Sequence, residues 1–248
     1  LLMNASVILS TLNSVQLACM NMFRQENVSS KKAIRVVIVD EASQSTEPEL
    51  LMPLIYPISK MILIGDHLQL PATVISGIAL RMGYGRSMFE RPHRHFEQNF
   101  GSENPMLSLC RQFRMNHAIC AFPSKHFYKG MLETPHGTGV NRRIPIQPYF
   151  LFDVVDANER QTTTLVNASR FNLAEVEFIF KLILIILNKL NYKVTKDSVG
   201  DLPDQLPVTI GVITFYKGQK QELIRKLEEF HDGVLKKHID VNTVDAFQ

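Results

Sequence analysis

Two adjacent carboxylates, Asp40 and Glu41, directly follow four β-branched residues at 36–39. Such a run is typical of a strand buried on both faces at the centre of a parallel sheet. Ligands of open α/β sheets bind at the carboxyl ends of their strands. Nucleoside triphosphatases use an Asp at this place to hold Mg²⁺ and a neighbouring Glu to polarise the attacking water. Taken alone, the pattern is equally compatible with a solvated turn.

A second apolar run, at 62–64, leads into a polar loop that contains Gln69, Pro71 and Thr73. Gln69 is placed to reach from the strand end toward a bound phosphate, and Pro71 stiffens the loop. The Thr73 hydroxyl suits either a phosphate or the N-cap of the next helix. An ordinary turn is the alternative for this segment.

A third segment places Arg111 and Arg114 beside Phe113. An arginine fork suits phosphate oxygens, and an aromatic face suits a nucleobase. A helix start with solvated arginines is the alternative. Two later apolar runs also end in polar positions, which hold Tyr216 and Thr243.

Apolar runs and helical patterns alternate along the chain. We expect strands at 7–11, 36–40, 61–65, 149–155, 208–214 and 239–244, with a further short strand ending near Cys110. We expect helices at 48–54, 74–82, 117–128, 172–190 and 217–230. This alternation predicts an α/β fold with parallel sheets flanked by helices on both faces. Residues 91–105 are interpreted as a linker, and residues 134–148 and 193–207 as surface loops.

Composition sets limits on the class of protein. With 248 residues and 45% hydrophobic content, the chain can form one large or two modest domains. The net charge of +3 permits a nucleic-acid partner without requiring one. The 3 Cys are widely spaced, so no zinc or disulfide framework is expected, and a reducing compartment is favoured. The apolar stretch 178–187 is shorter than the about 20 residues of a membrane span, so we expect no membrane partner.

The segments occur in the order and spacing of superfamily 1 helicases, and the chain resembles the group that includes the nonsense-mediated-decay RNA helicase and senataxin. Residues 40–44 resemble motif II, 65–74 motif III, 112–115 the Gln-Tyr-Arg-Met motif, 214–219 a Thr-Pro-Tyr-x-x-Gln element, and 243–248 the opening of motif V. The run 7–11 is similar to the RNA-contacting strand before motif II. The residues at positions 70–76 and 83–89 favour the senataxin-like branch.

This resemblance implies an α/β fold of two RecA-like domains. The first, over 1–95, is incomplete, and the second, over 96–248, is truncated at motif V. It also implies an ATP-dependent helicase or translocase that acts on RNA or RNA:DNA hybrids, or on DNA, in the 5′-to-3′ direction. Its cofactors would be ATP and Mg²⁺, and its partner single-stranded RNA or DNA. The implied location is the nucleus, with the cytoplasm as the alternative.

The resemblance also implies residue roles. Glu41 would activate water, Gln69 would sense the γ-phosphate, and Arg114 would act as an arginine finger from the second domain. Asp40 would hold Mg²⁺, and the nucleotide would contact Phe113 and Tyr216. The candidates for contact with nucleic acid are Ser10, Thr11, Pro71, Thr73 and Thr243.

Four positions depart from the family pattern, without removing a catalytic group. His67, Ala72 and Phe215 stand where the family usually has Pro, and Phe113 stands where it has Tyr.

Two expected motifs are missing from these residues. No Gly-Lys pair of a P-loop occurs, and the Arg-rich motif VI expected after motif V is missing from these residues as well. The chain begins with Leu, so we interpret it as a fragment and expect it to be inactive by itself. A non-catalytic binding or scaffold protein with a degenerate helicase fold is the alternative. A general P-loop ATPase is disfavoured because the loops at 70–73 and 112–115 are of helicase type.

Overall fold

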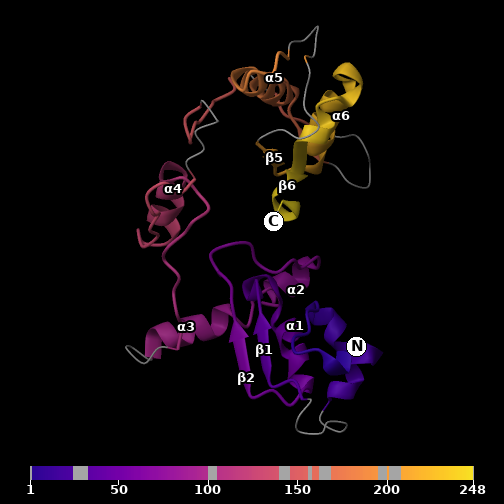
Figure 1. Cartoon of the computed structure of the whole chain (residues 1–248), viewed down its shortest axis with the longest axis vertical. Helices are drawn as coiled ribbons and strands as arrows, with labels where there is room; N and C mark the ends of the chain where they lie inside the picture. The colour runs from indigo at the N-terminus through magenta and orange to yellow at the C-terminus, as the bar shows by residue number, and fades with distance from the viewer. Residues whose placement is uncertain are drawn as a thin grey trace. The chain divides into compact units, whose positions relative to one another are not determined.

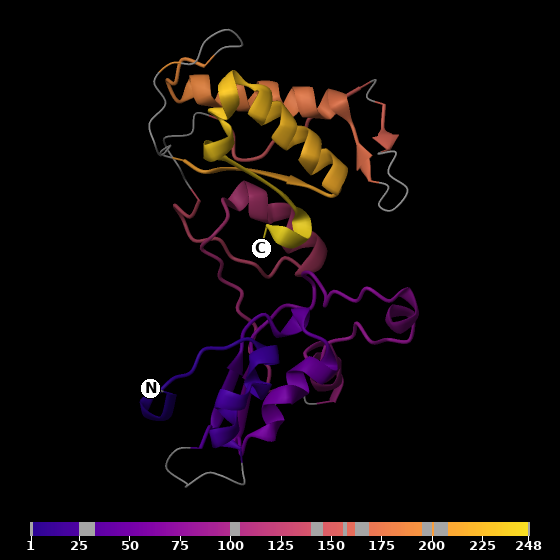
Figure 2. The same cartoon turned by 90° about the vertical axis from the view of Figure 1, so that its right-hand side faces the viewer.

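The computed structural model describes residues 2–24, 33–99, 105–139, 146–155, 158–161, 169–194, 200 and 208–247. The chain divides into two compact units, Leu1–Ser108 and Leu109–Gln248. Each unit combines helices with a small parallel sheet (Figures 1 and 2), so the expected α/β class is confirmed. The assignment of 1–95 and 96–248 to two RecA-like domains stays a prediction.

The first unit is built around two parallel strands, β1 (Val36–Val39) and β2 (Lys60–Leu63). They are joined by α1 (Glu47–Leu51), which begins where the Glu49 carboxylate accepts hydrogen bonds from the backbone N–H and hydroxyl of Thr46. The other helical elements of this unit are η1 (Leu2–Asn4), η2 (Leu12–Gln16), η3 (Ala18–Phe23), η5 (Ala42–Gln44), η6 (Met52–Ile55), α2 (Gly77–Arg81) and α3 (Glu90–Asn99).

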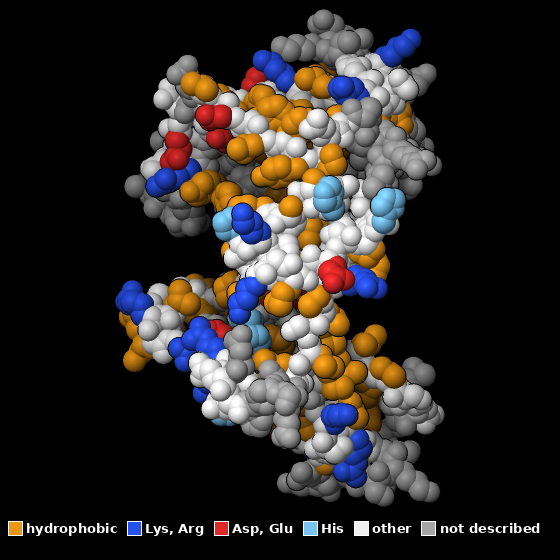
Figure 3. Space-filling view, turned by 90° about the vertical axis from the view of Figure 1, so that its left-hand side faces the viewer, with side chains coloured by type: hydrophobic (Ala, Val, Ile, Leu, Met, Phe, Trp, Pro, Cys, Tyr) orange, Lys and Arg blue, Asp and Glu red, His pale blue; other side chains and the backbone are white. Residues whose placement is uncertain are grey.

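The two faces of the β1–β2 pair differ in burial. Val39 packs with Ala42 and Leu50 on the face that meets α1, whereas Val36 and Ile38 on the other face are 50% and 62% exposed. Successive side chains of a strand point to opposite faces, and in the described part of this unit one face is covered. The expectation that β1 is buried on both faces is therefore wrong. Figure 3 shows hydrophobic side chains gathered on the surface of the molecule.

The second unit contains a second parallel pair, β5 (Ile210–Thr214) with β6 (Ile239–Thr243). Its helices are α4 (His117–Phe127), α5 (Leu173–Lys189), α6 (Lys217–Glu229), η8 (His231–Gly233), η9 (Lys236–His238) and η10 (Val244–Ala246). A short antiparallel pair, β3 (Arg160–Gln161) with β4 (Arg170–Phe171), was not expected from the sequence.

The core of the second unit lies between α5, α6 and the inner face of the β5–β6 pair. The buried side chains of α5 recur at helical spacing and form one stripe: Val176, Phe180, Ile183, Leu184 and Leu187. The helix begins as the sequence predicts, because the Asn172 side chain accepts a hydrogen bond from the Ala174 backbone N–H at 3.0 Å. None of the helices in the described ranges is long and apolar enough to cross a membrane.

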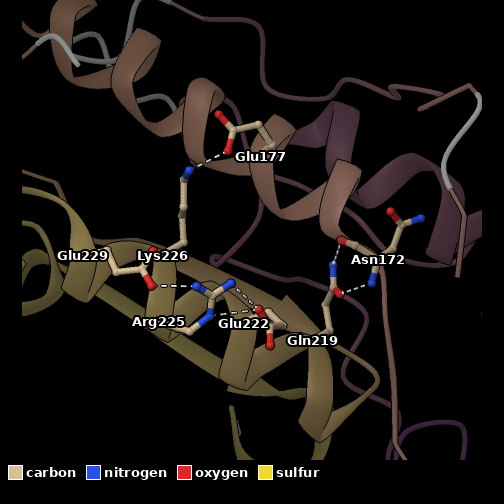
Figure 4. Close-up of polar contacts among 7 residues, drawn as sticks. All are labelled: Asn172, Glu177, Gln219, Glu222, Arg225, Lys226 and Glu229. Atoms are coloured by element: carbon tan, nitrogen blue, oxygen red, sulfur yellow. Dashed lines mark hydrogen bonds and ion pairs between the residues drawn. The ribbon is translucent and has the colours of Figure 1, made fainter. Parts of the chain in front are cut away.

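Polar contacts fasten α5 to α6 (Figure 4). The buried Gln219 side chain accepts a hydrogen bond from the Asn172 backbone N–H at 2.7 Å. Lys226 pairs with Glu177 at 2.7 Å and also lies over the ring of Phe180, 5.2 Å from its centroid. The Gln219 contact fixes the start of α6, which directly follows Tyr216, and the Lys226 contacts hold its last turn against α5.

The interpretation of 91–105 as a linker is wrong over its first part, because α3 occupies Glu90–Asn99. The Ser87 hydroxyl accepts a hydrogen bond from the Glu90 backbone N–H at 3.1 Å and caps this helix. Arg94 pairs with Glu90 one turn away at 2.7 Å. These local polar contacts stabilise a helix that the mixed composition of residues 91–105 did not indicate.

Two expected strands do not form. Residues 7–11 and 149–155 belong to no strand, since within the described ranges no neighbouring strand pairs with them. Near Cys110 the expected strand is reduced to a single bridge between Arg111 and Glu133. Much of the predicted loops at 134–148 and 193–207 lies outside the described residues.

Candidate functional site

Backbone hydrogen bonds join the carboxyl ends of β1 and β2. The N–H of Ile64 donates to the C=O of Val39 at 2.8 Å, and the N–H of Ala42 donates to the C=O of Ile64 at 2.8 Å. The loops that follow the two strands therefore leave the sheet side by side. This edge is where ligands of parallel sheets bind.

Gly65 allows these loops to approach closely. A Cβ atom at this position would lie 2.9 Å from the backbone nitrogen of Ser43, closer than real Cβ contacts allow. Beyond the glycine, the backbone N–H of Asp66 donates to the Ser43 hydroxyl at 3.2 Å. The second loop is thus attached to the first by both backbone and side-chain contacts.

Glu41 has a left-handed backbone, with φ 51° and ψ 37°. Such a conformation costs a non-glycine residue about 1–2 kcal/mol and is enriched at functional positions. It turns the chain from β1 into η5, and the backbone N–H of Glu41 donates to Asp40 Oδ1 at 3.0 Å. The Gln44 side chain donates to Glu41 Oε2 at 3.1 Å. Both exposed carboxylates are therefore oriented by local hydrogen bonds.

Gln69 is oriented by Asp66, which was not expected from the sequence to act in the site. The Gln69 side-chain amide donates to Asp66 Oδ2 at 2.9 Å, and the Leu68 backbone N–H donates to Asp66 Oδ1 at 3.0 Å. Asp66 thus closes a tight turn that presents the exposed Gln69 side chain. Asp40, Glu41 and Gln69 all belong to the two joined loops.

Asp40 fits a Mg²⁺ site of the kind found in nucleoside triphosphatases. Mg²⁺ there is held by one or two carboxylates together with substrate phosphates and waters, and not by a cage of protein ligands. Within the ranges that the structure describes, no group of three or more His, Cys, Asp or Glu residues could hold a metal ion. A single exposed carboxylate at a strand end is compatible with a Mg²⁺ ion whose other ligands are phosphates and waters.

The first four candidates for nucleic-acid contact are all exposed and lie in the first unit. Ser10 and Thr11 directly precede η2, whose Leu12 packs against the apolar cluster beneath β1. Pro71 and Thr73 lie in the loop after Gln69, at 70–76, which has no regular secondary structure. Thr73 is not the helix cap, because the Ser76 hydroxyl caps α2.

Phe113 and Arg114 lie on a turn that precedes α4. Phe113 is 71% exposed, and Arg114 is also exposed. Arg111 pairs with Glu133 at 3.7 Å, whereas no carboxylate pairs with Arg114 in the part of the chain that the structure describes. Of the two arginines, Arg114 therefore has the guanidinium that is available to a phosphate.

Tyr216 and Thr243 lie together at the carboxyl ends of the second parallel pair. Thr243 ends β6 directly opposite Thr214, and Tyr216 follows two residues later as the N-cap position of α6. Asn242 accepts a hydrogen bond from the Lys220 ammonium group at 2.7 Å. The structure thus repeats in this unit the edge-of-sheet arrangement that holds Asp40 in the first.

The residues that orient the candidates were not expected from the sequence. Gln44 and Asp66 act on Glu41 and Gln69, each from three residues away. Gln112 holds the turn that carries Arg114. A short polar side chain or amide three residues from a candidate is the signal that could have identified the first two.

Comparison with known proteins assigns a class to this arrangement. Two family models, each described as an AAA domain, match residues 1–77 and 84–248. AAA domains have a RecA-like fold, which agrees with parallel strands that carry carboxylates at their ends. The chain is therefore of the nucleotide-binding α/β class.

Individual relatives narrow the class to a family. The chain is 41% identical over 219 residues to the probable helicase senataxin of Homo sapiens, across 86% of this chain and 8% of that protein. It is 35% identical over 229 residues to the probable helicase MAGATAMA 3 of Arabidopsis thaliana, across 88% of this chain and 25% of that protein. It is 31% identical over 226 residues to the regulator of nonsense transcripts 1 homolog of Arabidopsis thaliana, across 86% of this chain and 16% of that protein. The chain thus spans a quarter or less of the length of these relatives.

The chain belongs to the superfamily 1 helicases, in the group that contains senataxin and the regulators of nonsense transcripts.

Proposed function

We propose that this chain is part of an ATP-dependent helicase or translocase that acts in the 5′-to-3′ direction on RNA or RNA:DNA hybrids, or on DNA, in the nucleus. The observation that carries this proposal is the pair of joined loops at the ends of β1 and β2. They hold Asp40, Glu41 and Gln69 at one edge of a parallel sheet, in a chain of the superfamily 1 helicase family. Residues 1–95 and 96–248 would belong to two RecA-like domains.

The first unit supplies the groups that act on the terminal phosphate. Asp40 holds Mg²⁺, which when bound neutralises charge on the β- and γ-phosphates. Glu41 orients and polarises the attacking water, with its own carboxylate held by Gln44. Gln69, held by Asp66, contacts the γ-phosphate and distinguishes ATP from its hydrolysis product.

The second unit supplies an arginine finger. Arg114 stabilises the negative charge that develops during transfer, an effect worth about 10³–10⁵ in rate for such residues. The absence of a carboxylate partner among the described residues supports Arg114 over Arg111 for this role. Phe113 and Tyr216 contact the nucleotide, and Phe113 stacks near the adenine.

Nucleic acid is held through its backbone. Hydroxyl and backbone groups of Ser10, Thr11, Pro71, Thr73 and Thr243 contact phosphate and sugar, which tracks a strand without reading its sequence. Closure of the domains around ATP shifts this grip, and hydrolysis resets it.

The test uses the full-length protein. We expect ATP hydrolysis that is stimulated by single-stranded RNA or DNA, and unwinding of duplexes that carry a 5′ overhang but not of those with a 3′ overhang. The 248-residue chain tested by itself serves as the control and should hydrolyse ATP negligibly, because it contains no Gly-Lys pair. Nucleic-acid binding by the full-length protein without ATP hydrolysis would contradict the proposal and favour a scaffold role.

A further inference from the structure

We propose that Gln112 is a positioning residue that sets the direction of Arg114. This inference rests on the proposed role of Arg114 in phosphoryl transfer, and it assigns to Gln112 a task distinct from contact with the nucleotide.

Every hydrogen-bonding position of the Gln112 side chain is used within the protein. Its Oε1 atom accepts from the backbone N–H groups of Arg114 at 2.9 Å and Met115 at 2.7 Å. Its Nε2 atom donates to the C=O of Met115 at 2.8 Å and to the Thr134 hydroxyl at 2.6 Å. An amide has one acceptor oxygen and two N–H donors, so this set saturates it. The side chain therefore has no remaining donor for a nucleotide or a nucleic acid.

The arrangement admits one orientation of the amide. If oxygen and nitrogen were exchanged, an NH₂ group would face the two backbone N–H donors of Arg114 and Met115. That orientation would lose both bonds and set donors against donors. To make all four bonds, the side chain at position 112 must carry both an acceptor and a donor at the end of two methylene groups. Among uncharged side chains, only Gln does so.

The turn that carries Arg114 is anchored on both sides by hydrogen bonds. The backbone N–H of Gln112 donates to the C=O of Glu133 at 2.9 Å, and the N–H of Glu133 donates to the C=O of Cys110 at 2.8 Å. On the other side of the turn, Asn116 caps α4 by accepting a hydrogen bond from the Ala118 N–H at 3.0 Å. Gln112 thus holds the turn between two fixed points.

The direction of Arg114 depends on its backbone. Its guanidinium pairs with no carboxylate in the described ranges, whereas Arg111 is held by Glu133. Catalytic groups must be held within about 0.5 Å and 10–20° of their productive geometry. Because the guanidinium lies at the end of a long side chain, a small rotation at the Arg114 backbone displaces it by more than that limit.

The experiment measures ATP hydrolysis by the full-length protein with four variants. Gln112→Ala should lower kcat about 10- to 100-fold, the effect of a displacement near 1 Å, with a smaller change in KM for ATP. Arg114→Ala should lower kcat at least as much. The double variant should be no slower than Arg114→Ala alone, since Gln112 acts through Arg114. Thr134→Val, which removes one of the four bonds, should have the smallest effect.

A second readout follows the turn directly. Hydrogen exchange of the Arg114 and Met115 amides should accelerate in Gln112→Ala while the amides of α6 keep their wild-type rates. Gln112→Glu keeps the two acceptor contacts and should restore slow exchange at these amides, which also provides a folded variant if Gln112→Ala does not fold.

The outcomes separate the two proposals. Wild-type kcat in Arg114→Ala would overturn the proposed role of Arg114. Three results, each combined with a slow Arg114→Ala, would overturn the positioning role alone. They are wild-type kcat in folded Gln112→Ala, wild-type kcat despite fast Arg114 and Met115 exchange in Gln112→Glu, and a double variant slower than Arg114→Ala by the full factor seen in Gln112→Ala.

Discussion

The Ser43 hydroxyl accepts a hydrogen bond from the backbone N–H of Asp66 at 3.2 Å, across 23 residues of sequence. This bond joins the loop that carries Glu41 to the loop that carries Gln69. Because the two loops are joined in this way, the distance between Glu41 and Gln69 depends on the structure of the sheet edge. Perturbing that edge should therefore affect stability as well as chemistry.

Gly65→Ala should destabilise the first unit. The new Cβ would lie 2.9 Å from the Ser43 backbone nitrogen, so the loops must separate, at a cost of about 1–3 kcal/mol. The measurement is the free energy of unfolding from urea titration. Gly77→Ala is the matched control, since its Cβ would meet nothing closer than a flexible Arg81 nitrogen at 3.9 Å. Equal stability of the two variants would contradict this account of the sheet edge.

Gln219→Ala should loosen the junction of α5 and α6 (Figure 4). It leaves the buried Asn172 backbone N–H without its 2.7 Å acceptor, at a cost of about 1–3 kcal/mol. Gln221→Ala, two residues along the same helix at an exposed position, is the control and should stay within about 0.5 kcal/mol of wild type. Thermal unfolding of the second unit compares the two, and a Gln219 variant as stable as its control would show that the contact is dispensable.

The stability of the first unit should fall at alkaline pH through Tyr56. Burial of this side chain, which is 3% exposed, raises the pKa of Tyr56 above its usual value, with Arg24 acting in the opposite direction. Its hydroxyl donates to the C=O of Val15. Because the folded state holds the proton more tightly, this contribution is complete below about pH 10, the unfolded value. It is lost as pH rises through the higher folded value.

Tyr56→Phe tests this assignment. It should lower stability by about 1 kcal/mol at neutral pH and flatten the decline above pH 10. The exposed Tyr84 provides the control, because Tyr84→Phe should leave the decline unchanged. Urea unfolding between pH 8 and 11 gives both curves, and parallel wild-type and Tyr56→Phe curves would refute the role of Tyr56.

The sequence predicted the strands and helices that carry strong local signals. The parallel strands around Val37 and Val212, the Asn172 cap and the long helix after it were all expected and are confirmed. The β-branched runs and the capping asparagine act locally, so they can be identified without the rest of the fold.

Features that depend on distant partners could not be predicted in the same way. The run at 149–155 has the composition of a strand but pairs with none in the described ranges, and α3 contacts the distant Glu47 through Arg91. The face on which Ile38 is exposed could not be foreseen from a run of four β-branched residues. For the site, residue types indicated Asp40, Glu41 and Gln69, whereas the orienting role of Gln112 is evident only from its contacts in the folded chain.

The central claim is that Glu41 activates water for ATP hydrolysis. The most direct measurement compares ATP turnover and ATP affinity in the full-length protein for wild type and Glu41→Gln, with the exposed Glu229→Gln as control. The Glu41 variant should lose at least about 10²-fold in turnover, as expected when a general base is removed, while binding ATP and single strands as wild type does. The control should match wild type in both. Weakened ATP binding with unchanged turnover per bound nucleotide in Glu41→Gln would contradict the account.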